Sequence, residues 1–348
     1  MRLSKYTPRT LDPAKRGLKT SAMIASLAAE GAPTVAAPFG HALCEAAAAD
    51  PRIVGLTADL SKYTDLHVFA ARYPDRFHQM GMAEQVMISA AAGLAREGFI
   101  PFATTYAVFA SRRAYDFICM AIAEESLPVK IVCALPGLTT GYGPSHQATE
   151  DLAILRAMPN LTVIDPCDAF EIAQATHAIA AHPGPCYMRL LRGNVPSVLH
   201  DSGHQFEIGK AKLLRDGDDV LFVSTGLMTM RVLEAATRLA VAGVSAAVLH
   251  VATLKPLDTE AIVAACRKPG RLVVTAENHS IVGGLGEAVA GALMRAGVHP
   301  AFRQIALPDA FLDAGALPTL HDRYGLSAAS VVSSIKSWLY NFKRPAHF

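Results

Sequence analysis

Short, wholly apolar runs alternate with longer amphipathic segments along most of the chain. The apolar runs predict buried strands, and segments with apolar residues three and four positions apart predict helices. In the first half, strands are expected at 53–57, 100–104, 129–134, 161–164 and 186–191, and helices at 38–49, 84–95, 107–123, 149–158 and 169–181. This β-α-β-α order is typical of a doubly wound parallel sheet.

The same alternation resumes after a polar segment at 193–204 that is rich in glycine, serine and proline. Strands are then expected at 220–224, 244–250, 271–276 and 302–306, and helices at 230–242, 258–266, 285–296 and 327–339. Because 193–204 has linker composition, we place a domain boundary there. The prediction is an α/β fold of two doubly wound domains, at 34–197 and 198–348, after an N-terminal extension at 1–33.

Composition narrows the classes of function. The 348 residues are 51% hydrophobic and 18% charged, which suits two domains with sizeable cores. A net charge of +2 without a dense basic face gives no reason to expect nucleic acid. No apolar stretch approaches the ~18 residues that span a bilayer, so no membrane partner is expected. The six cysteines are scattered, and we expect free thiols in a cytoplasmic protein.

Candidate chemistry gathers between Gly81 and Gln147, at the borders of predicted elements. Glu84 opens the helix at 84–95, where an acid also simply suits the helix dipole. His146 ends a long loop at 135–147, where it is either a functional group or a helix cap. Tyr106 and Phe109 have a spacing that is also common in cores.

Two further features stay open on the sequence alone. Asp59 follows the strand at 53–57, at the end where open α/β sheets bind ligands, and an Asx turn is an equally good interpretation. The glycine-rich segment at 283–286 opens a predicted helix. It either holds an anion or forms a tight turn with close packing, and the second interpretation is favoured because a lone glycine cluster is a weak signal.

A series of short motifs carries a family resemblance. In order, they are GMAEQ at 81–85, AVFA at 107–110, SHQ at 145–147, RLLR at 189–192, STG at 224–226, TLKPLD at 253–258, ENH at 277–279 and GGLG at 283–286. Over roughly residues 35–340 the chain resembles the C-terminal half of transketolase, as found in organisms that split the enzyme into two subunits. The resemblance implies a pyrimidine-binding domain followed by the transketolase C-terminal domain.

The resemblance also implies thiamine diphosphate as cofactor. Glu84 matches the catalytic acid that contacts N1′ of the aminopyrimidine, and such a carboxyl is expected to be buried and protonated. Tyr106 and Phe109 match aromatic residues that pack on the pyrimidine, and Arg112 stands where many relatives have a third aromatic residue. Asp59 matches an acid that approaches the cofactor across a subunit interface.

Three more residues are implied on the substrate side. His146 matches a second catalytic residue, a histidine near the reactive carbon of the cofactor. Arg192 matches a phosphate-binding arginine, and Tyr142 replaces an aspartate that reads the 2-hydroxyl of the acceptor. The Gly-Asp-Gly run that usually holds Mg²⁺ and the diphosphate does not occur. We therefore expect no metal ligands here, and a separate N-terminal subunit that brings the metal and diphosphate site in an α2β2 assembly.

Departures from the family pattern point to an unusual substrate. Ala36, Tyr63 and Ala134 stand where an arginine, a serine and a histidine are usual, and Tyr142 adds a fourth change. Four changes on one wall indicate a reshaped sugar site. We expect a branched or modified ketose phosphate, such as apulose 4-phosphate.

The sequence thus predicts one subunit of a thiamine diphosphate-dependent transketolase, which passes a two-carbon ketol unit to an acceptor carbonyl. Two alternatives stay open: a β subunit of a 2-oxo acid dehydrogenase, and a non-catalytic homologue that stabilises its partner. No catalytic residue is predicted in the second domain, for which subunit packing is the expected use.

Overall fold

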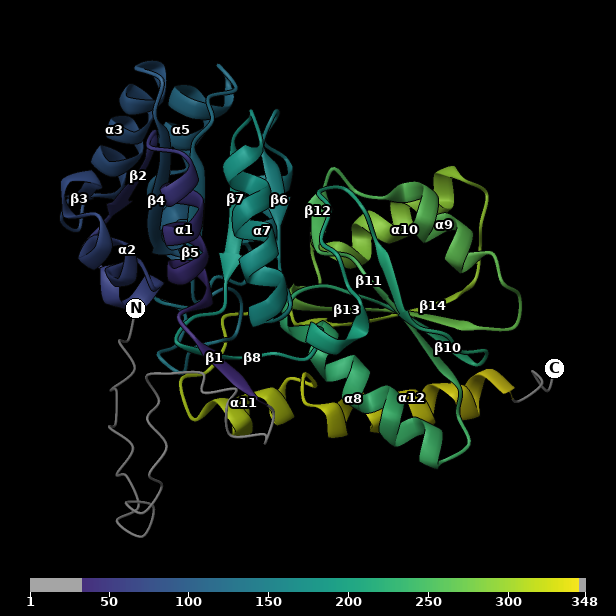
Figure 1. Ribbon diagram of the computed structural model, residues 1–348. Helices are drawn as coiled ribbons and strands as arrows, with labels where there is room; N and C mark the ends of the chain where they lie inside the picture. Colours follow the sequence, from purple (N-terminus) through teal and green to yellow (C-terminus); the bar gives the residue numbers. More distant parts are fainter. Residues whose placement is uncertain (1–32, 344–348) are drawn as a thin grey trace, which may run out of the picture.

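Two α/β units lie side by side in the computed structural model, which describes residues 33–343 (Figure 1). Each unit has a central, mostly parallel sheet with helices packed against it, so the predicted fold class is confirmed. The predicted extension at 1–33 lies, apart from Pro33, outside the described residues. The domain boundary at 197/198 stays a prediction.

The first sheet positions the candidate site. Its strands run in the order β12-β6-β7-β5-β4-β2-β3, and all neighbours are parallel except β12 and β6. They are β2 (Ile53–Thr57), β3 (Phe77–Gln79), β4 (Ile100–Tyr106), β5 (Lys130–Ala134), β6 (Thr162–Ile164), β7 (Cys186–Leu190) and β12 (Thr253–Lys255). Parallel strands place their carboxyl ends along one edge, where a ligand site forms.

One strand of this sheet comes from the far side of the predicted boundary. Strand β12 pairs antiparallel with β6, Thr253 opposite Ile164, and so extends the first sheet with residues that follow β11 of the second unit. A strand of three residues is too short to produce a periodic pattern, which is why the sequence did not predict it. The two units therefore share backbone hydrogen bonds.

Two groups of helices accompany the first sheet. In one group, α1 (Pro38–Ala49) packs on α2 (His67–Arg72) and on α7 (Ala169–Ala181), which lies beside it in Figure 1. The second group comprises α3 (Glu84–Arg96), α4 (Ala107–Arg113), α5 (Tyr115–Ile118) and α6 (Asp151–Arg156).

The single helix predicted at 107–123 is wrong. It is divided into α4, α5 and a π-helical turn, Cys119–Ala123. The backbone leaves the helical region at Ala114 (φ −106°, ψ 7°), and because alanine favours helix, no residue type marked the break.

The second unit has five strands in the order β14-β13-β10-β11-β9, with only β9 antiparallel to its neighbour. They are β9 (Lys212–Arg215), β10 (Val220–Ser224), β11 (Ala246–His250), β13 (Leu272–Ser280) and β14 (Ala301–Leu307). Its helices are α8 (Leu227–Val241), α9 (Thr259–Cys266), α10 (Leu285–Arg295), α11 (Leu317–Arg323) and α12 (Ala328–Lys343). Helices α9 and α10 pack together above this sheet in Figure 1, and α8 packs on α12 below it.

Part of the predicted linker at 193–204 is regular structure. Strand β8 (Asn194–Pro196) pairs antiparallel with β1 (Thr34–Ala36) in a separate two-stranded ribbon. This pairing places Ala36 opposite Asn194, two residues after Arg192. A short 3₁₀ turn, His200–Ser202, follows.

A buried arginine joins the two units. Arg189 in β7 is 1% exposed and makes two hydrogen bonds with the carboxylate of Asp151 and one of 3.2 Å with Asp165. It also donates to the backbone oxygen of Asn278 in β13, at 3.2 Å. Burial favours neutral Asp151, but the Arg189 charge and hydrogen bonds outweigh it and lower the pKa of Asp151. Burial raises the pKa of Asp165 to about 6, although the charge of Arg189 and its hydrogen bond oppose this shift.

The glycine-rich segment at 283–286 encloses a carboxylate from the chain itself. Glu277 in β13 accepts hydrogen bonds from the backbone N–H groups of Leu285 (2.6 Å) and Gly286 (2.8 Å) at the start of α10. A Cβ atom on Gly284 would lie 1.9 Å from the Glu277 carboxylate, so glycine is required there. The close-packing interpretation is confirmed. Burial raises the pKa of Glu277 to about 7, although the two backbone hydrogen bonds oppose the shift.

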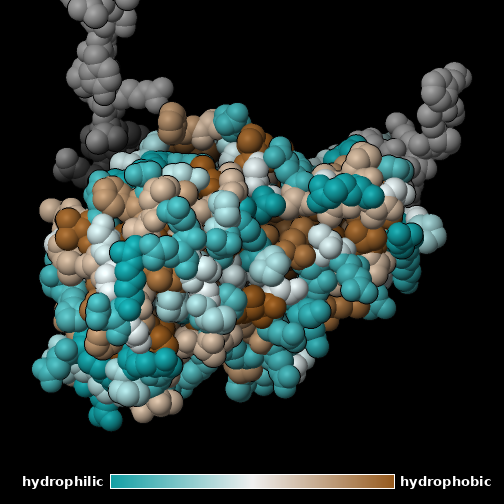
Figure 2. Space-filling view, turned by 90° about the horizontal axis from the view of Figure 1, so that it is seen from above, coloured by the Kyte–Doolittle hydropathy of each residue, from teal (hydrophilic) through white to brown (hydrophobic). Residues whose placement is uncertain are grey.

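The surface is mixed in character. Seen from above, it carries polar side chains interspersed with separate apolar patches (Figure 2). Within residues 33–343, no helix combines the length and apolarity that a membrane span requires.

Replacing Arg189 by Met should lower the free energy of unfolding by about 3–5 kcal/mol, because Asp151 would stay buried without its partner. Arg52→Met is the matched control, since Arg52 pairs with Asp50 at the surface, and it should leave the free energy of unfolding nearly unchanged. Urea unfolding of both variants measures the difference. Equal costs would contradict a central role for Arg189.

The raised pKa of Glu277 predicts a pH effect on stability. Its folded pKa of about 7 exceeds the ordinary 4.5, so its contribution is fully present below pH 4.5 and is lost as the pH rises through 7. Glu277→Gln stays uncharged. From pH 5 to 8 its stability should therefore rise relative to wild type, by on the order of 3 kcal/mol in total. Urea unfolding midpoints of both proteins across this pH range test the prediction, with the exposed Glu260→Gln variant as control. A pH-independent difference would refute the assignment.

Candidate active site

A buried acid stands at the carboxyl edge of the first sheet. Glu84 is the first residue of α3 and is only 2% exposed, as predicted for its position. Arg113, in the last turn of α4, donates to both carboxylate oxygens at 3.2 and 3.3 Å, and the Thr105 hydroxyl donates to one at 3.5 Å. These contacts are long, and a carboxylate offers about four lone-pair positions. The group can therefore still accept a shorter hydrogen bond.

Arg113 is a site residue that sequence reasoning missed. Its guanidinium carbon lies 4.2 Å from the centre of the Phe109 ring, so one side chain contacts both the acid and the aromatic wall. The protonated state that the sequence led us to expect for Glu84 stays a prediction. The Arg113 side chain is 50% exposed, which leaves it free to move. A basic residue in the last turn of a helix is usually solvated, so nothing in the sequence singled it out.

The predicted aromatic wall and histidine come together beside this acid. The rings of Tyr106 and Phe109 lie with their centres 5.7 Å apart. The His146 ring meets them at 6.1 and 5.5 Å, edge-on in both cases. Tyr142 completes the group, with its ring centre 5.1 Å from that of His146. Residues 40 positions apart in the chain thus form one surface.

The surroundings of His146 set its charge. Burial lowers the pKa of His146, and the Arg113 charge lowers it further, so the ring is neutral at pH 7. Nδ1 forms a 2.9 Å hydrogen bond with the hydroxyl of Ser145. Nε2 is then the ring nitrogen left for a ligand. A neutral imidazole with one nitrogen engaged can accept or deliver a proton at the other.

Arg112 fixes the end of the loop that carries His146. Its guanidinium forms an ion pair with Glu150 and donates to the backbone oxygens of Pro144 (3.0 Å) and Gln147 (3.3 Å). These contacts occupy the side chain, which therefore positions the loop. The cofactor contact expected for Arg112 stays a prediction.

Residues of the second domain form hydrogen bonds with the rest of the loop at 135–147. The Asn278 side chain accepts a hydrogen bond from the N–H of Leu138 at 2.8 Å, and the His321 ring bonds the Leu138 oxygen at 2.7 Å. Gly315 N–H donates to Gly141 O at 3.0 Å, and the Gln147 amide donates to Asp313 O at 3.2 Å. The second domain, for which the sequence suggested packing alone, thus holds the site loop in place.

Asp59 lies at the end of β2 and is tied to its neighbour strand. Its backbone N–H donates to the Gln79 side chain (2.8 Å), whose amide donates back to the Asp59 carboxylate (3.2 Å). Gln79 also accepts from Gly81 N–H at 3.1 Å, and so connects Asp59 to the turn that leads into Glu84. Asp59 has a left-handed backbone (φ 60°) and is exposed, which leaves its carboxylate accessible.

One of the four positions that depart from the family pattern, Tyr63, contacts Arg192. The Arg192 guanidinium lies over the Tyr63 ring, 5.3 Å from the centre. Ala134 pairs in register with Tyr106. Burial raises the pKa of Tyr106, and the charge of Arg192 opposes this shift. Arg192 Nε is buried without a hydrogen-bond partner in the described part of the chain.

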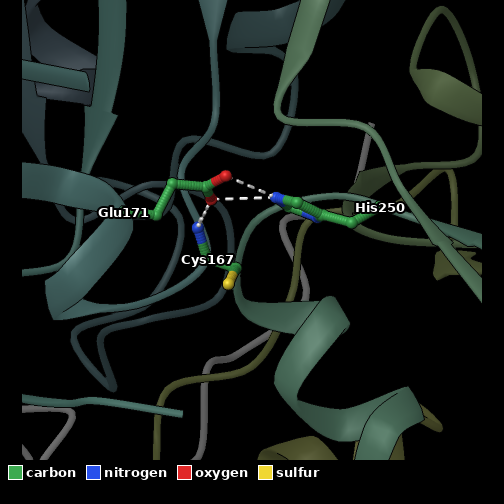
Figure 3. Close-up of side chains that lie close together, drawn as sticks. All are labelled: Cys167, Glu171 and His250. Atoms are coloured by element: carbon green, nitrogen blue, oxygen red, sulfur yellow. Dashed lines mark hydrogen bonds and ion pairs between the residues drawn. The ribbon is translucent and has the colours of Figure 1, made fainter. Parts of the chain in front are cut away.

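The described residues contain one group of three potential metal ligands: Cys167, Glu171 and His250. None of them belongs to the strands and loops around Glu84. Figure 3 shows this group, which we consider further below.

Comparisons with known proteins agree with this architecture. Residues 32–198 match the family model of the transketolase pyrimidine-binding domain, and residues 209–331 match that of the transketolase C-terminal domain. A transketolase family protein of Sinorhizobium fredii is 68% identical over 343 residues, which cover 97% of this chain and 99% of that protein.

Two further relatives are informative. The 6-deoxy-6-sulfo-D-fructose transketolase subunit of a Clostridium species is 42% identical over 292 residues, 83% of this chain and 89% of the relative. A solved structure described as an inactive beta4 tetramer of a split-gene transketolase superposes with a TM-score of 0.79 at 41% identity, and covers 88% of this chain and 98% of its own. The chain therefore belongs to the transketolase family, as a C-terminal section that combines the pyrimidine-binding and C-terminal domains.

Proposed function

We propose that this chain is the C-terminal subunit of a split transketolase that transfers a two-carbon ketol unit from a ketose phosphate to an acceptor carbonyl. The observation that carries the proposal is the buried carboxylate of Glu84 next to an aromatic wall and a neutral histidine. A pyrimidine-binding domain implies thiamine diphosphate, and this group of residues suits its aminopyrimidine half.

The side chains fit the cofactor as follows. Tyr106 and Phe109 offer an apolar wall on which a flat heterocycle gains about 1 kcal/mol beyond its burial. Glu84 retains lone pairs for N1′ of the pyrimidine, since its present contacts are 3.2 Å or longer. When bound, thiamine diphosphate supplies the carbon nucleophile and the electron sink for cleavage of the ketose.

The chain's own residues then control protons and orientation. Glu84 would hydrogen-bond N1′ of the pyrimidine, and Arg113 holds the Glu84 carboxyl in place through hydrogen bonds of 3.2 and 3.3 Å. His146 is neutral at pH 7 and hydrogen-bonds a hydroxyl or carbonyl of the sugar through Nε2. Asp59 is exposed at the sheet edge, where an acid can reach a cofactor shared between subunits.

We propose a branched or modified ketose phosphate as substrate, with apulose 4-phosphate as the leading example. Tyr142 lies beside His146. At this position it offers a phenol ring in place of a carboxylate that would bind the 2-hydroxyl of an aldehyde acceptor. Tyr63 under Arg192 and Ala134 beside Tyr106 reshape the wall where the anionic end of the sugar binds. The relative named for 6-deoxy-6-sulfo-D-fructose supports a modified ketose, because a guanidinium binds sulfonate and phosphate alike.

We propose that the chain works with a separate N-terminal subunit, which holds Mg²⁺ and the diphosphate, in an α2β2 assembly. The relative described as an inactive beta4 tetramer supports self-association and the need for a second subunit, since its name refers to a tetramer of beta subunits and to inactivity. The family match favours this function over a 2-oxo acid dehydrogenase subunit. A non-catalytic role is tested by the first experiment below.

Replacing Glu84 by Gln should lower turnover of the pair reconstituted with its N-terminal subunit at least about a hundredfold, because proton sharing with the cofactor is lost. Glu97→Gln, at the exposed end of the same helix, is the matched control and should keep wild-type activity. Gel filtration checks that both variants still assemble. Unchanged turnover in assembled Glu84→Gln would establish the non-catalytic alternative.

The substrate proposal predicts a preference that Tyr142 controls. The wild-type pair should turn over apulose 4-phosphate faster than xylulose 5-phosphate with ribose 5-phosphate. Tyr142→Asp should shift the ratio of kcat/KM at least about tenfold toward the 2-hydroxy aldehyde acceptor. Val241→Asp, at the exposed end of α8, should leave the ratio unchanged. Full activity of the wild type on the ordinary pentose phosphates would refute this substrate.

A further inference from the structure

A second cluster of reactive side chains lies at the junction of the two domains. Cys167 precedes α7, Glu171 lies in the first turn of α7, and His250 ends β11 of the second domain. All three are at most 1% exposed, and the thiol sulfur, a carboxylate oxygen and a ring nitrogen lie within 4.8 Å of one another. Figure 3 shows the Glu171 carboxylate between the His250 ring and the Cys167 backbone.

A second histidine reaches the same carboxylate from the segment between the domains. His204 Nε2 lies 2.8 Å from Glu171 Oε1, while His250 Nε2 lies 2.9 and 2.8 Å from the two oxygens. The four side chains thus come from the first domain, the connecting segment and the second domain.

The groups behind these side chains are arranged like the outer shell of a metal site. His250 Nδ1 bonds the Thr229 hydroxyl at 2.7 Å, and this hydroxyl bonds Ser224 at 2.9 Å. The Glu171 carboxylate accepts the backbone N–H of Cys167 at 2.7 Å. Such contacts fix the orientation of a ligating imidazole and carboxylate. They would leave His250 Nε2 directed at the centre of the cluster.

We propose that Cys167, Glu171, His250 and His204 bind one Zn²⁺ ion that joins the two domains. One thiolate, one carboxylate and two imidazoles are a ligand set typical of tetrahedral zinc, whereas a thiolate disfavours Mg²⁺ and Ca²⁺. The thiolate and the carboxylate balance the charge of the ion, so it brings no net charge into the buried junction. The site is separate from the proposed thiamine diphosphate site.

The ligand atoms of the four side chains must rearrange to accept the ion. Bonds of about 2.0–2.3 Å place tetrahedral ligand atoms about 3.3–3.6 Å apart. The Glu171 oxygens lie closer than this to the two ring nitrogens, at 2.8–2.9 Å, and the Cys167 sulfur lies within 4.8 Å of the ligand atoms of Glu171 and His250. Rotations of the four side chains would close the difference. The hydrogen bonds to Glu171 then give way to bonds to the ion.

The test uses the untagged full chain, freed of metal with a chelator and titrated with cobalt chloride or zinc sulfate. We expect one Co²⁺ per chain, with a thiolate-to-cobalt charge-transfer band that Zn²⁺ displaces, and a higher Tm with either ion. Cys167→Ser should abolish the band. Cys119→Ser, in the π-helical turn, is the matched control and should retain it.

A supporting variant separates ligation from folding. Thr229→Val should keep the cobalt band but weaken Zn²⁺ binding about 10–100-fold, as loss of an outer-shell partner does. Circular dichroism confirms that each variant is folded. A folded wild type without a stoichiometric charge-transfer band would overturn the proposal, and so would a band that survives in Cys167→Ser.

Discussion

The position of the candidate active site depends on one buried guanidinium. Arg189 joins Asp151 at the start of α6, Asp165 after β6, and the backbone of Asn278 in the second domain. Asn278 in turn holds Leu138 in the loop that leads to His146. A buried charge is tolerated only when its partners have good geometry. This requirement places the two domains and the loop in one arrangement.

The candidate active site contains groups suited to only one half of the cofactor. One sheet edge brings together an acid, an aromatic wall and a neutral histidine, which suit the organic half of thiamine diphosphate. Arg113 pairs with the acid in the described chain, and the guanidinium of Arg192 lies over the Tyr63 ring. We therefore propose that this chain contributes recognition and proton control, and that a partner subunit completes the site.

Much of this arrangement could be predicted from the sequence. Apolar runs predicted the central strands, and the family motifs named Glu84, Tyr106, Phe109 and His146. These residues lie in the first turns of α3 and α4, at the end of β4, and in the loop after β5. The break at Ala114, the strand β12 and the hydrogen bonds from Asn278 and His321 could not be predicted. They rest on contacts between residues far apart in the chain, and on a backbone change at a residue that favours helix. Arg113 was missed because its sequence position is that of an ordinary solvated side chain.

The central claim is that this chain carries only the pyrimidine half of a shared cofactor site. Isothermal titration calorimetry with thiamine diphosphate and Mg²⁺ tests it most directly, on this chain, on its N-terminal partner and on an equimolar mixture. The account predicts stoichiometric binding in the mixture and much weaker binding to either chain alone. Tight stoichiometric binding of the cofactor to this chain by itself would contradict it.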